Sequence, residues 1–179
     1  MDAIPYTCAA GVAPALVRRL VQVESSGNRF AIGVVGGRLA RQPRNLPDAV
    51  ATVRSLEAQG ANYSVGISQV NRFHFARLGW HRAPHIAFDA CANLRAGAGI
   101  LQDCFVRAGG AGFRGAALDG RNPATRAALS CYYAGDFARG ERLGYVAKYA
   151  GATGVAGMGA ITKASAPPAR RPTILPLFD

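Results

Sequence analysis

The most regular apolar pattern in this chain reads ACANLRAGAGILQDCFVR over residues 90–107. Its apolar side chains recur at the three- and four-residue spacing of one helix face: Cys91, Leu94, Ala98, Leu101 and Phe105. Asp89 precedes the pattern as a candidate N-cap, and Gly109 and Gly110 follow it as a stop signal. The stretch therefore predicts a long helix with one buried face.

Shorter helices are predicted on both sides of this one. Capping residues, proline in the first turn and apolar spacing indicate helices over residues 14–26, 47–59, 72–78, 123–134 and 141–150. Residues 33–46 are rich in Gly, Arg and Pro and indicate a loop or short hairpin, whereas residues 63–70 are extended but too few for a real sheet. We expect one mainly α domain over residues 1–150. Residues 151–179 are rich in Pro, Ala and Gly without periodicity, which predicts a disordered tail.

The size and charge of the chain narrow the function classes. Its 179 residues suffice for one domain with a sizeable core. The 21 Lys and Arg residues against 10 Asp and Glu residues give a net charge of +11. This charge favours a polyanionic partner without distinguishing nucleic acid, an anionic lipid surface and an acidic cell-wall polymer. No apolar run approaches the roughly 18 residues of a membrane span, so we expect no such span.

The four cysteines have no spacing typical of a zinc site. Their even number is compatible with two disulfides in an oxidising compartment, and also with four buried, reduced thiols. Cys91 and Cys104 lie about 20 Å apart on the long predicted helix, too far to bond to each other. Two pairings remain: Cys8–Cys91 with Cys104–Cys131, or Cys8–Cys104 with Cys91–Cys131. Residues 1–5 lack the features of a secretory leader, so we expect that an exported form starts with a leader this sequence does not include.

A carboxyl group stands where the predicted helix over residues 14–26 should present another apolar side chain. Stepping four residues from Leu20, or three from Val21, leads to Glu24. Burial and the negative end of the helix dipole would both raise the pKa of this carboxyl, as a general acid requires. The alternative is an ordinary helix-end glutamate that reaches solvent. The remaining carboxylates are predicted to lie at a helix cap, on polar helix faces or in loops.

Four short motifs follow one another along the chain: ES at residues 24–25, GISQVN at 66–71, NLRAGAGIL at 93–101 and CYYAG at 131–135. Each is weak alone, but their combination and order are specific. They resemble the E-S, G-L-M-Q-x-N, N-I/L-x-x-G-x-x-x-L and A-Y-N-x-G motifs of the soluble lytic transglycosylases. The long connection over residues 31–59 and the cysteine-bearing variants resemble most the specialised transglycosylases of type IV secretion systems.

The resemblance implies a lysozyme-like α+β fold, in which a small β and loop region lines a substrate cleft. It implies that Glu24 is the single acid/base that cleaves the β-1,4 bond between N-acetylmuramic acid and N-acetylglucosamine and leaves 1,6-anhydro ends. It also implies a periplasmic protein whose partners are peptidoglycan glycan strands and other components of a secretion system. No cofactor, metal or nucleic acid is expected.

The resemblance also implies further site residues, which would bind substrate: Ser25, Gly66, Ser68, Gln69, Asn71, Tyr132 and Tyr133. Ser68 and Tyr133 depart from the Met and Asn of the family pattern, whereas Tyr132 matches a tyrosine whose hydroxyl lies near the catalytic carboxyl. Taken singly, the residues of the GISQVN motif are also typical of turns. By resemblance to two-cysteine members of the family, we favour Cys8–Cys91 with Cys104–Cys131.

Other side chains that could carry chemistry have plainer interpretations. His74, His81 and His85 flank an irregular stretch without a matching ligand group. Trp80 could stack on a sugar or cover the core, and we favour the core. Tyr145 matches a further tyrosine near the cleft in the family that this chain resembles, and we favour its other interpretation, a core aromatic. Three alternative functions remain at this point: a muramidase that uses water, as a goose-type lysozyme does, a basic module that binds nucleic acid, and a structural component in which Glu24 is dispensable.

Overall fold

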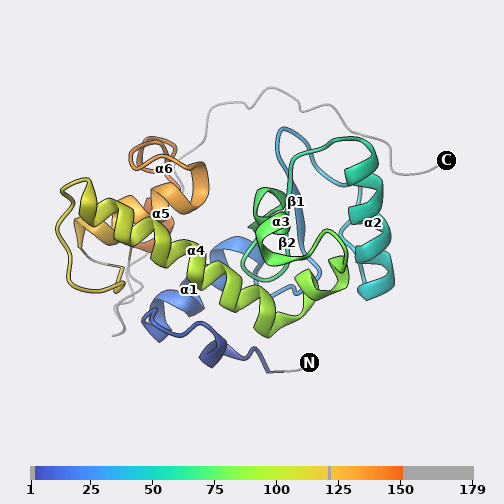
Figure 1. Cartoon of the computed structure of the whole chain (residues 1–179), viewed down its shortest axis with the longest axis horizontal. Helices are drawn as coiled ribbons and strands as arrows, with labels where there is room; N and C mark the ends of the chain where they lie inside the picture. The colour runs from blue at the N-terminus through green and yellow to red at the C-terminus, as the bar shows by residue number, and fades with distance from the viewer. Residues whose placement is uncertain (1–2, 121, 151–179) are drawn as a thin grey trace, which may run out of the picture.

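The pattern over residues 90–107 forms α4 (Ala90–Gly110), which runs through the middle of the molecule (Figure 1). The structure is a computed structural model that describes residues 3–120 and 122–150. Asp89 caps α4, because its Oδ1 accepts a hydrogen bond of 2.7 Å from the backbone N–H of Ala92. The helix includes Gly109 and Gly110 in its last turn and so ends three residues later than predicted.

A helical lobe surrounds the part of α4 that lies beside α5 (Figure 1). Its elements are η1 (Tyr6–Cys8), α1 (Pro14–Ser25), α5 (Pro123–Ala134), α6 (Arg139–Arg142) and η4 (Val146–Tyr149). Asn122 caps α5 by accepting a 2.8 Å hydrogen bond from the backbone N–H of Thr125, and Gly135 ends it in the left-handed region. The helix predicted over residues 141–150 is wrong in extent. Gly144 has a φ of +72° there, which separates α6 from η4.

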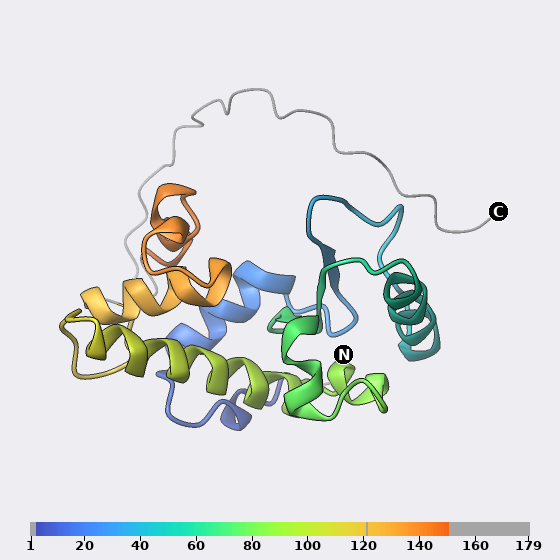
Figure 2. The same ribbon diagram turned by 45° about the horizontal axis from the view of Figure 1, so that its top comes forward.

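A smaller sheet lobe, residues 32–88, lies at the other end of α4 (Figures 1 and 2). Its helices are α2 (Leu46–Ala58), η2 (Arg72–His74), α3 (Phe75–Leu78) and η3 (Pro84–Phe88), and its strands are β1 (Ile32–Val34), β2 (Tyr63–Val65) and β3 (Val70–Asn71). The strands form an antiparallel sheet in the order β1-β2-β3, with Val65 opposite both Ile32 and Val70. The prediction that residues 63–70 are too few for a sheet is therefore wrong, because β1 supplies a partner strand from far along the chain.

Two clusters of buried side chains form the core, one in each lobe, and α4 contributes to both. Leu94 and Leu101 belong to the cluster of the helical lobe, whereas Ile100 belongs to that of the sheet lobe. Trp80 is buried in the second cluster, as predicted. The interior thus continues from one lobe to the other along a single helix.

Both disulfides attach to α4: Cys8 pairs with Cys91, and Cys104 pairs with Cys131. This is the pairing that the family resemblance implies. The tail predicted over residues 151–179 lies outside the described residues. No helix within the described ranges is long and apolar enough to cross a membrane.

Candidate active site

A cavity of about 910 Å³ lies between the two lobes. Its lining comes from β1, β2, β3 and η2 of the sheet lobe, from the second half of α4, from the ends of α1 and α5, and from the start of α6. Five of the predicted site residues line it: Glu24, Gln69, Asn71, Tyr132 and Tyr133. Ser25, Gly66 and Ser68 are absent from the lining and have other roles, described below.

Glu24 lies in the last turn of α1, at the end of the stripe formed by Leu16, Val17, Leu20 and Val21. The Tyr145 hydroxyl donates a hydrogen bond to its Oε1, and the Tyr149 hydroxyl donates a longer one of 3.4 Å. The two tyrosine hydroxyls also contact each other at 2.7 Å. Burial raises the pKa of Glu24, and this effect exceeds the opposing effects of the two hydrogen bonds and of the Lys148 charge. The carboxyl therefore keeps its proton to a higher pH than an exposed glutamate does.

The tyrosine that bonds to this carboxyl is Tyr145, whereas Tyr132, which was expected near it, has another hydrogen-bond partner. Tyr145 was predicted to be a core aromatic; it is buried, but it bonds to Glu24. Tyr132 donates its hydrogen bond to the backbone carbonyl of Ser68 at 2.5 Å instead. Burial, followed by the nearby charge of Glu24, raises the pKa of Tyr132 well above its usual value, so its hydroxyl stays neutral. Tyr132 thus lies within the electrostatic reach of Glu24 and holds the loop beside it.

The loop between β2 and β3 is tied to three helices by side-chain hydrogen bonds. From α1, Ser25 Oγ donates to the Ile67 carbonyl at 2.8 Å. From α4, Asn93 Oδ1 accepts from the backbone N–H of Ser68 at 2.7 Å, and Asn93 Nδ2 donates to the Val65 carbonyl at 3.0 Å. With the bond from Tyr132 of α5, these contacts fix the loop against the helical lobe. Ser25 is therefore a positioning residue rather than part of the cavity wall.

Gly66 and Ser68, which lie outside the cavity lining, make close packing contacts with α4 and its neighbours. Gly66 has a φ of +77°, and a Cβ there would lie 2.3 Å from Asn93 Nδ2 and 2.7 Å from the Ala87 carbonyl oxygen. The loop thus approaches Asn93 too closely for any side chain at this position. Ser68 is fully buried, and a Cβ on Gly97 of α4 would lie only 2.6 Å from its Cβ. The small side chain fits this contact, in which the larger Met of the family pattern would not fit without rearrangement.

Gln69 and Asn71 line the cavity, and their amide groups brace the sheet lobe. Gln69 Nε2 donates to the carbonyl oxygens of Ala31 and Gly66 at 3.0 and 2.9 Å. Asn71 Nδ2 donates to Asn62 Oδ1 at 2.9 Å. These bonds fix the orientation of both amides at the cavity wall.

Tyr133 lines the cavity from α5 and is half exposed. Its ring stacks on that of Tyr145, with 4.3 Å between the centroids and 12° between the planes. Tyr133 therefore covers the tyrosine that bonds to Glu24.

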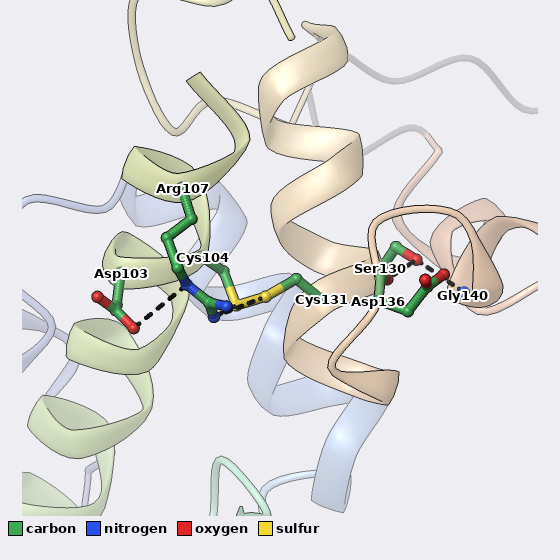
Figure 3. The surroundings of a disulfide bond; sticks show 7 residues. All are labelled: Asp103, Cys104, Arg107, Ser130, Cys131, Asp136 and Gly140. Atoms are coloured by element: carbon green, nitrogen blue, oxygen red, sulfur yellow. Dashed lines mark hydrogen bonds and ion pairs between the residues drawn. A yellow bond between two sulfur atoms is a disulfide. The ribbon is translucent and has the colours of Figure 1, made fainter. Parts of the chain in front are cut away.

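The sequence prediction missed a pair of charges in the cavity wall, Asp103 and Arg107, which lie one turn apart on α4. Arg107 Nη2 lies 3.2 Å from Cys104 Sγ and 3.0 Å from Cys131 Sγ, so the guanidinium lies against the disulfide (Figure 3). Arg107 Nε is 3.6 Å from Asp103 Oδ2, and both side chains are more than half exposed. Their four-residue spacing is visible in the sequence, but the direction in which they point is not. A second carboxylate thus belongs to the cavity that contains Glu24.

Figure 3 also shows how the turn after α5 is held. Ser130 Oγ donates to the Asp136 carbonyl at 2.6 Å and accepts from the backbone N–H of Gly140 at 2.7 Å. This double contact fixes the start of α6, which carries the cavity residue Arg139.

The three histidines do not form a metal centre in the part of the chain that the structure describes. No three His, Cys, Asp or Glu side chains gather there in a group that could hold a metal ion. His74 lines the cavity, and burial lowers its pKa, which favours the neutral imidazole near pH 7.

A helical lobe and a small antiparallel sheet that enclose a cavity, with a partly buried carboxyl at the end of a helix, define a lysozyme-like domain. The profile of the Transglycosylase SLT domain family matches residues 3–153, and the chain belongs to this family. No solved structure matches the chain significantly.

Among curated proteins, the chain is similar to two virB1 proteins. It is 50% identical over 134 residues to the type IV secretion system protein virB1 of Brucella abortus, an overlap of 74% of this chain and 53% of the relative. It is 32% identical over 149 residues to protein virB1 of Rhizobium radiobacter, or 82% of this chain and 58% of the relative. The chain therefore spans a little more than half the length of these curated relatives.

Proposed function

We propose that this chain is a peptidoglycan lytic transglycosylase, and that Glu24 is its single acid/base. The observation that carries the proposal is the environment of Glu24, whose carboxyl is partly buried, has a raised pKa, accepts a hydrogen bond from Tyr145 and faces a cavity between the two lobes. A carboxyl with a raised pKa keeps its proton to a higher pH and can donate it to a leaving-group oxygen.

In the proposed reaction, the Glu24 proton passes to the oxygen that joins C1 of N-acetylmuramic acid to C4 of N-acetylglucosamine. The bond from C1 to this oxygen breaks, and the C6 hydroxyl of the same muramoyl residue attacks C1. That hydroxyl returns its proton to the Glu24 carboxylate, and the product has a 1,6-anhydro ring. Bonds and protons balance without water, so one carboxyl suffices, whereas hydrolytic glycosidases use two.

The other residues of the site would support this step without taking part in proton transfer. The hydrogen bonds from Tyr145 and Tyr149 would hold the carboxyl in one orientation and stabilise its anionic form after the proton has left. Gln69, Asn71 and Tyr133 would contact the glycan at the cavity wall.

The biological setting belongs to the same proposal. We infer a periplasmic role in which the enzyme opens peptidoglycan locally for a type IV secretion system, because the Brucella abortus relative is named as a type IV secretion system protein. Its partners would be glycan strands and other periplasmic components of that system. The net charge of +11 would attract the protein to the anionic wall polymer.

The Glu24→Gln variant tests the proposal. Purified peptidoglycan sacculi are incubated with the wild-type chain and with the variant, and the soluble muropeptides are identified by mass spectrometry. We expect anhydro-muramoyl ends from the wild type and no product from a folded Glu24→Gln protein. Retained lysis by the variant would refute the assignment of Glu24, and a wild type that binds sacculi without cleaving them would support a non-catalytic component.

Asp103 favours one second candidate, a muramidase that uses water. Its carboxylate lines the same cavity as Glu24 and is largely exposed, so it could act on a water molecule. This candidate requires reducing muramoyl ends, each heavier by one water than an anhydro end, and it requires that Asp103→Asn abolish their formation. Anhydro ends from an active Asp103→Asn variant would exclude it.

A further inference from the structure

Exposed apolar side chains gather around the cavity. Eight large apolar side chains are exposed among the described residues, and four of these line the cavity: Val35, Phe73, Tyr133 and Leu143. Phe73 is the most exposed of the eight, at 83%. Burial of a phenylalanine side chain stabilises a fold, and this protein forgoes that stabilisation at Phe73. Exposed apolar side chains that cluster beside a cavity are typical of binding sites.

The Phe73 ring is held at the cavity by the residues on both sides of it in and around η2. Asn71 Oδ1 accepts a hydrogen bond of 3.0 Å from the backbone N–H of Phe73. Arg72 donates to the Ala61 carbonyl at 2.6 Å, and Phe75 is buried in the core. The His74 ring meets Phe73 edge to face, with 5.3 Å between the centroids. Because the residues on both sides are anchored, the turn directs Phe73 outward.

The surroundings of Phe73 favour a sugar over a protein as the ligand. The same cavity wall presents amide and hydroxyl groups, from Asn62, Ser64 and Asn71. A pyranose ring has one face of C–H groups, which packs on a flat aromatic ring, and an edge of hydroxyl and acetamido groups, which bond to amides. The core of a protein–protein interface is depleted of charged residues, whereas the wall of this cavity includes Asp103 and Arg107.

We propose that Phe73 is a stacking platform for a pyranose ring of the β-1,4-linked, N-acetylated glycan that occupies this cavity. This inference rests on the proposed function and assigns a binding residue to it. Phe73 has no group that can exchange a proton, so it acts through binding alone. Removing it raises KM and leaves kcat nearly unchanged, because ground state and transition state lose the same contact.

The test uses the full chain and three substitutions, Phe73→Ala, Phe73→Trp and Phe73→Leu. Val106→Ala is the matched control, because Val106 is 72% exposed on α4 but lies outside the cavity lining. Binding of a hexamer of β-1,4-linked N-acetylglucosamine is measured by calorimetry in the Glu24→Gln background, which removes the proposed acid. The KM and kcat for sacculi are measured in the Glu24 background, and thermal melting checks folding.

We expect Phe73→Ala to weaken hexamer binding and raise KM by about tenfold, equivalent to about 1.4 kcal/mol. Phe73→Trp restores binding to within about twofold, whereas Phe73→Leu does not, because leucine lacks a flat ring. Wild-type affinity in Phe73→Ala, full rescue by Phe73→Leu, or equal weakening in Val106→Ala would each overturn the inference. Its failure is distinguishable from that of the proposed function, because the latter shows as a wild type that binds the hexamer but releases no anhydro product.

Discussion

Replacing Tyr145 by Phe removes one oxygen atom from the centre of the site and leaves the ring in place. The Tyr145 hydroxyl bonds to the Glu24 carboxyl and, at 2.7 Å, to the Tyr149 hydroxyl. A hydrogen bond between neutral groups contributes about 1 kcal/mol, and one to a charged group about 1.5–3 kcal/mol. Tyr149 already lies 3.4 Å from Glu24 and can take over part of the lost contact. We therefore expect Tyr145→Phe to lower the free energy of unfolding by about 2 kcal/mol, or about 4–8 °C in Tm.

The same substitution changes the pH dependence of activity in a defined direction. The hydrogen bond from Tyr145 lowers the pKa of Glu24, in opposition to burial, so its loss raises that pKa further. The proposed reaction starts from protonated Glu24, and activity falls as pH rises through its pKa. The alkaline limb of the kcat/KM profile therefore moves to higher pH in Tyr145→Phe. The maximum rate falls by about tenfold, because the carboxyl loses its main orienting contact.

The assay is the initial rate of muropeptide release from sacculi across the pH range, together with thermal melting. Tyr149→Phe is the matched control: it loses the bond to Tyr145 but only the longer contact with Glu24, so it costs about 1 kcal/mol and moves the alkaline limb less. An alkaline limb of Tyr145→Phe that stays in place or moves to lower pH would refute this account of the Glu24 environment. So would a Tm equal to that of the wild type.

Three further predictions concern stability. Burial raises the pKa of Glu24 in the folded state above 4.5, so the free energy of unfolding of the wild type falls as pH rises past 4.5. Because Gln does not ionise, denaturant unfolding should show Glu24→Gln to be more stable than the wild type at pH 7 and equally stable at pH 4. Gly66→Ala places a Cβ 2.3 Å from Asn93 Nδ2 at a positive φ and should cost about 3 kcal/mol, with Gly36→Ala, which has open space, as its control. Loop-closure entropy predicts that opening the Cys8–Cys91 loop of 83 residues costs about 1 kcal/mol more than opening the Cys104–Cys131 loop of 27; equal losses in the two double-alanine variants would contradict it.

The long helices could be predicted because their signals are local. The apolar spacing within residues 90–107, the Asp89 cap and the Asn122-Pro123 start each lie within a few residues of the structure they specify. The small sheet could not be predicted in this way. Its strands have two or three residues each, and Ile32 pairs with Val65, so the information that makes it a sheet lies far apart in the chain.

In the candidate site, too, residues with local signals could be predicted and those that depend on distant contacts could not. Glu24 could be found because it interrupts an apolar stripe whose period is set by its own helix. Its partner Tyr145 lies 121 residues away: the family resemblance points to a tyrosine near the cleft at this position, but the residue by itself favours a core aromatic. Ser25 and Ser68 were assigned to substrate because motif matching identifies positions, whereas hydrogen bonds and burial decide what each side chain does.

The two disulfides crosslink only one of the two lobes. Both are anchored on α4, and their other ends, Cys8 and Cys131, belong to the helical lobe. Residues 32–88 contain no cysteine, so no disulfide ties the sheet lobe to the rest of the chain. The crosslinks therefore restrict the lobe that holds Glu24 and its tyrosines, whereas the sheet lobe, which carries Phe73, is positioned by its two chain connections and by non-covalent contacts.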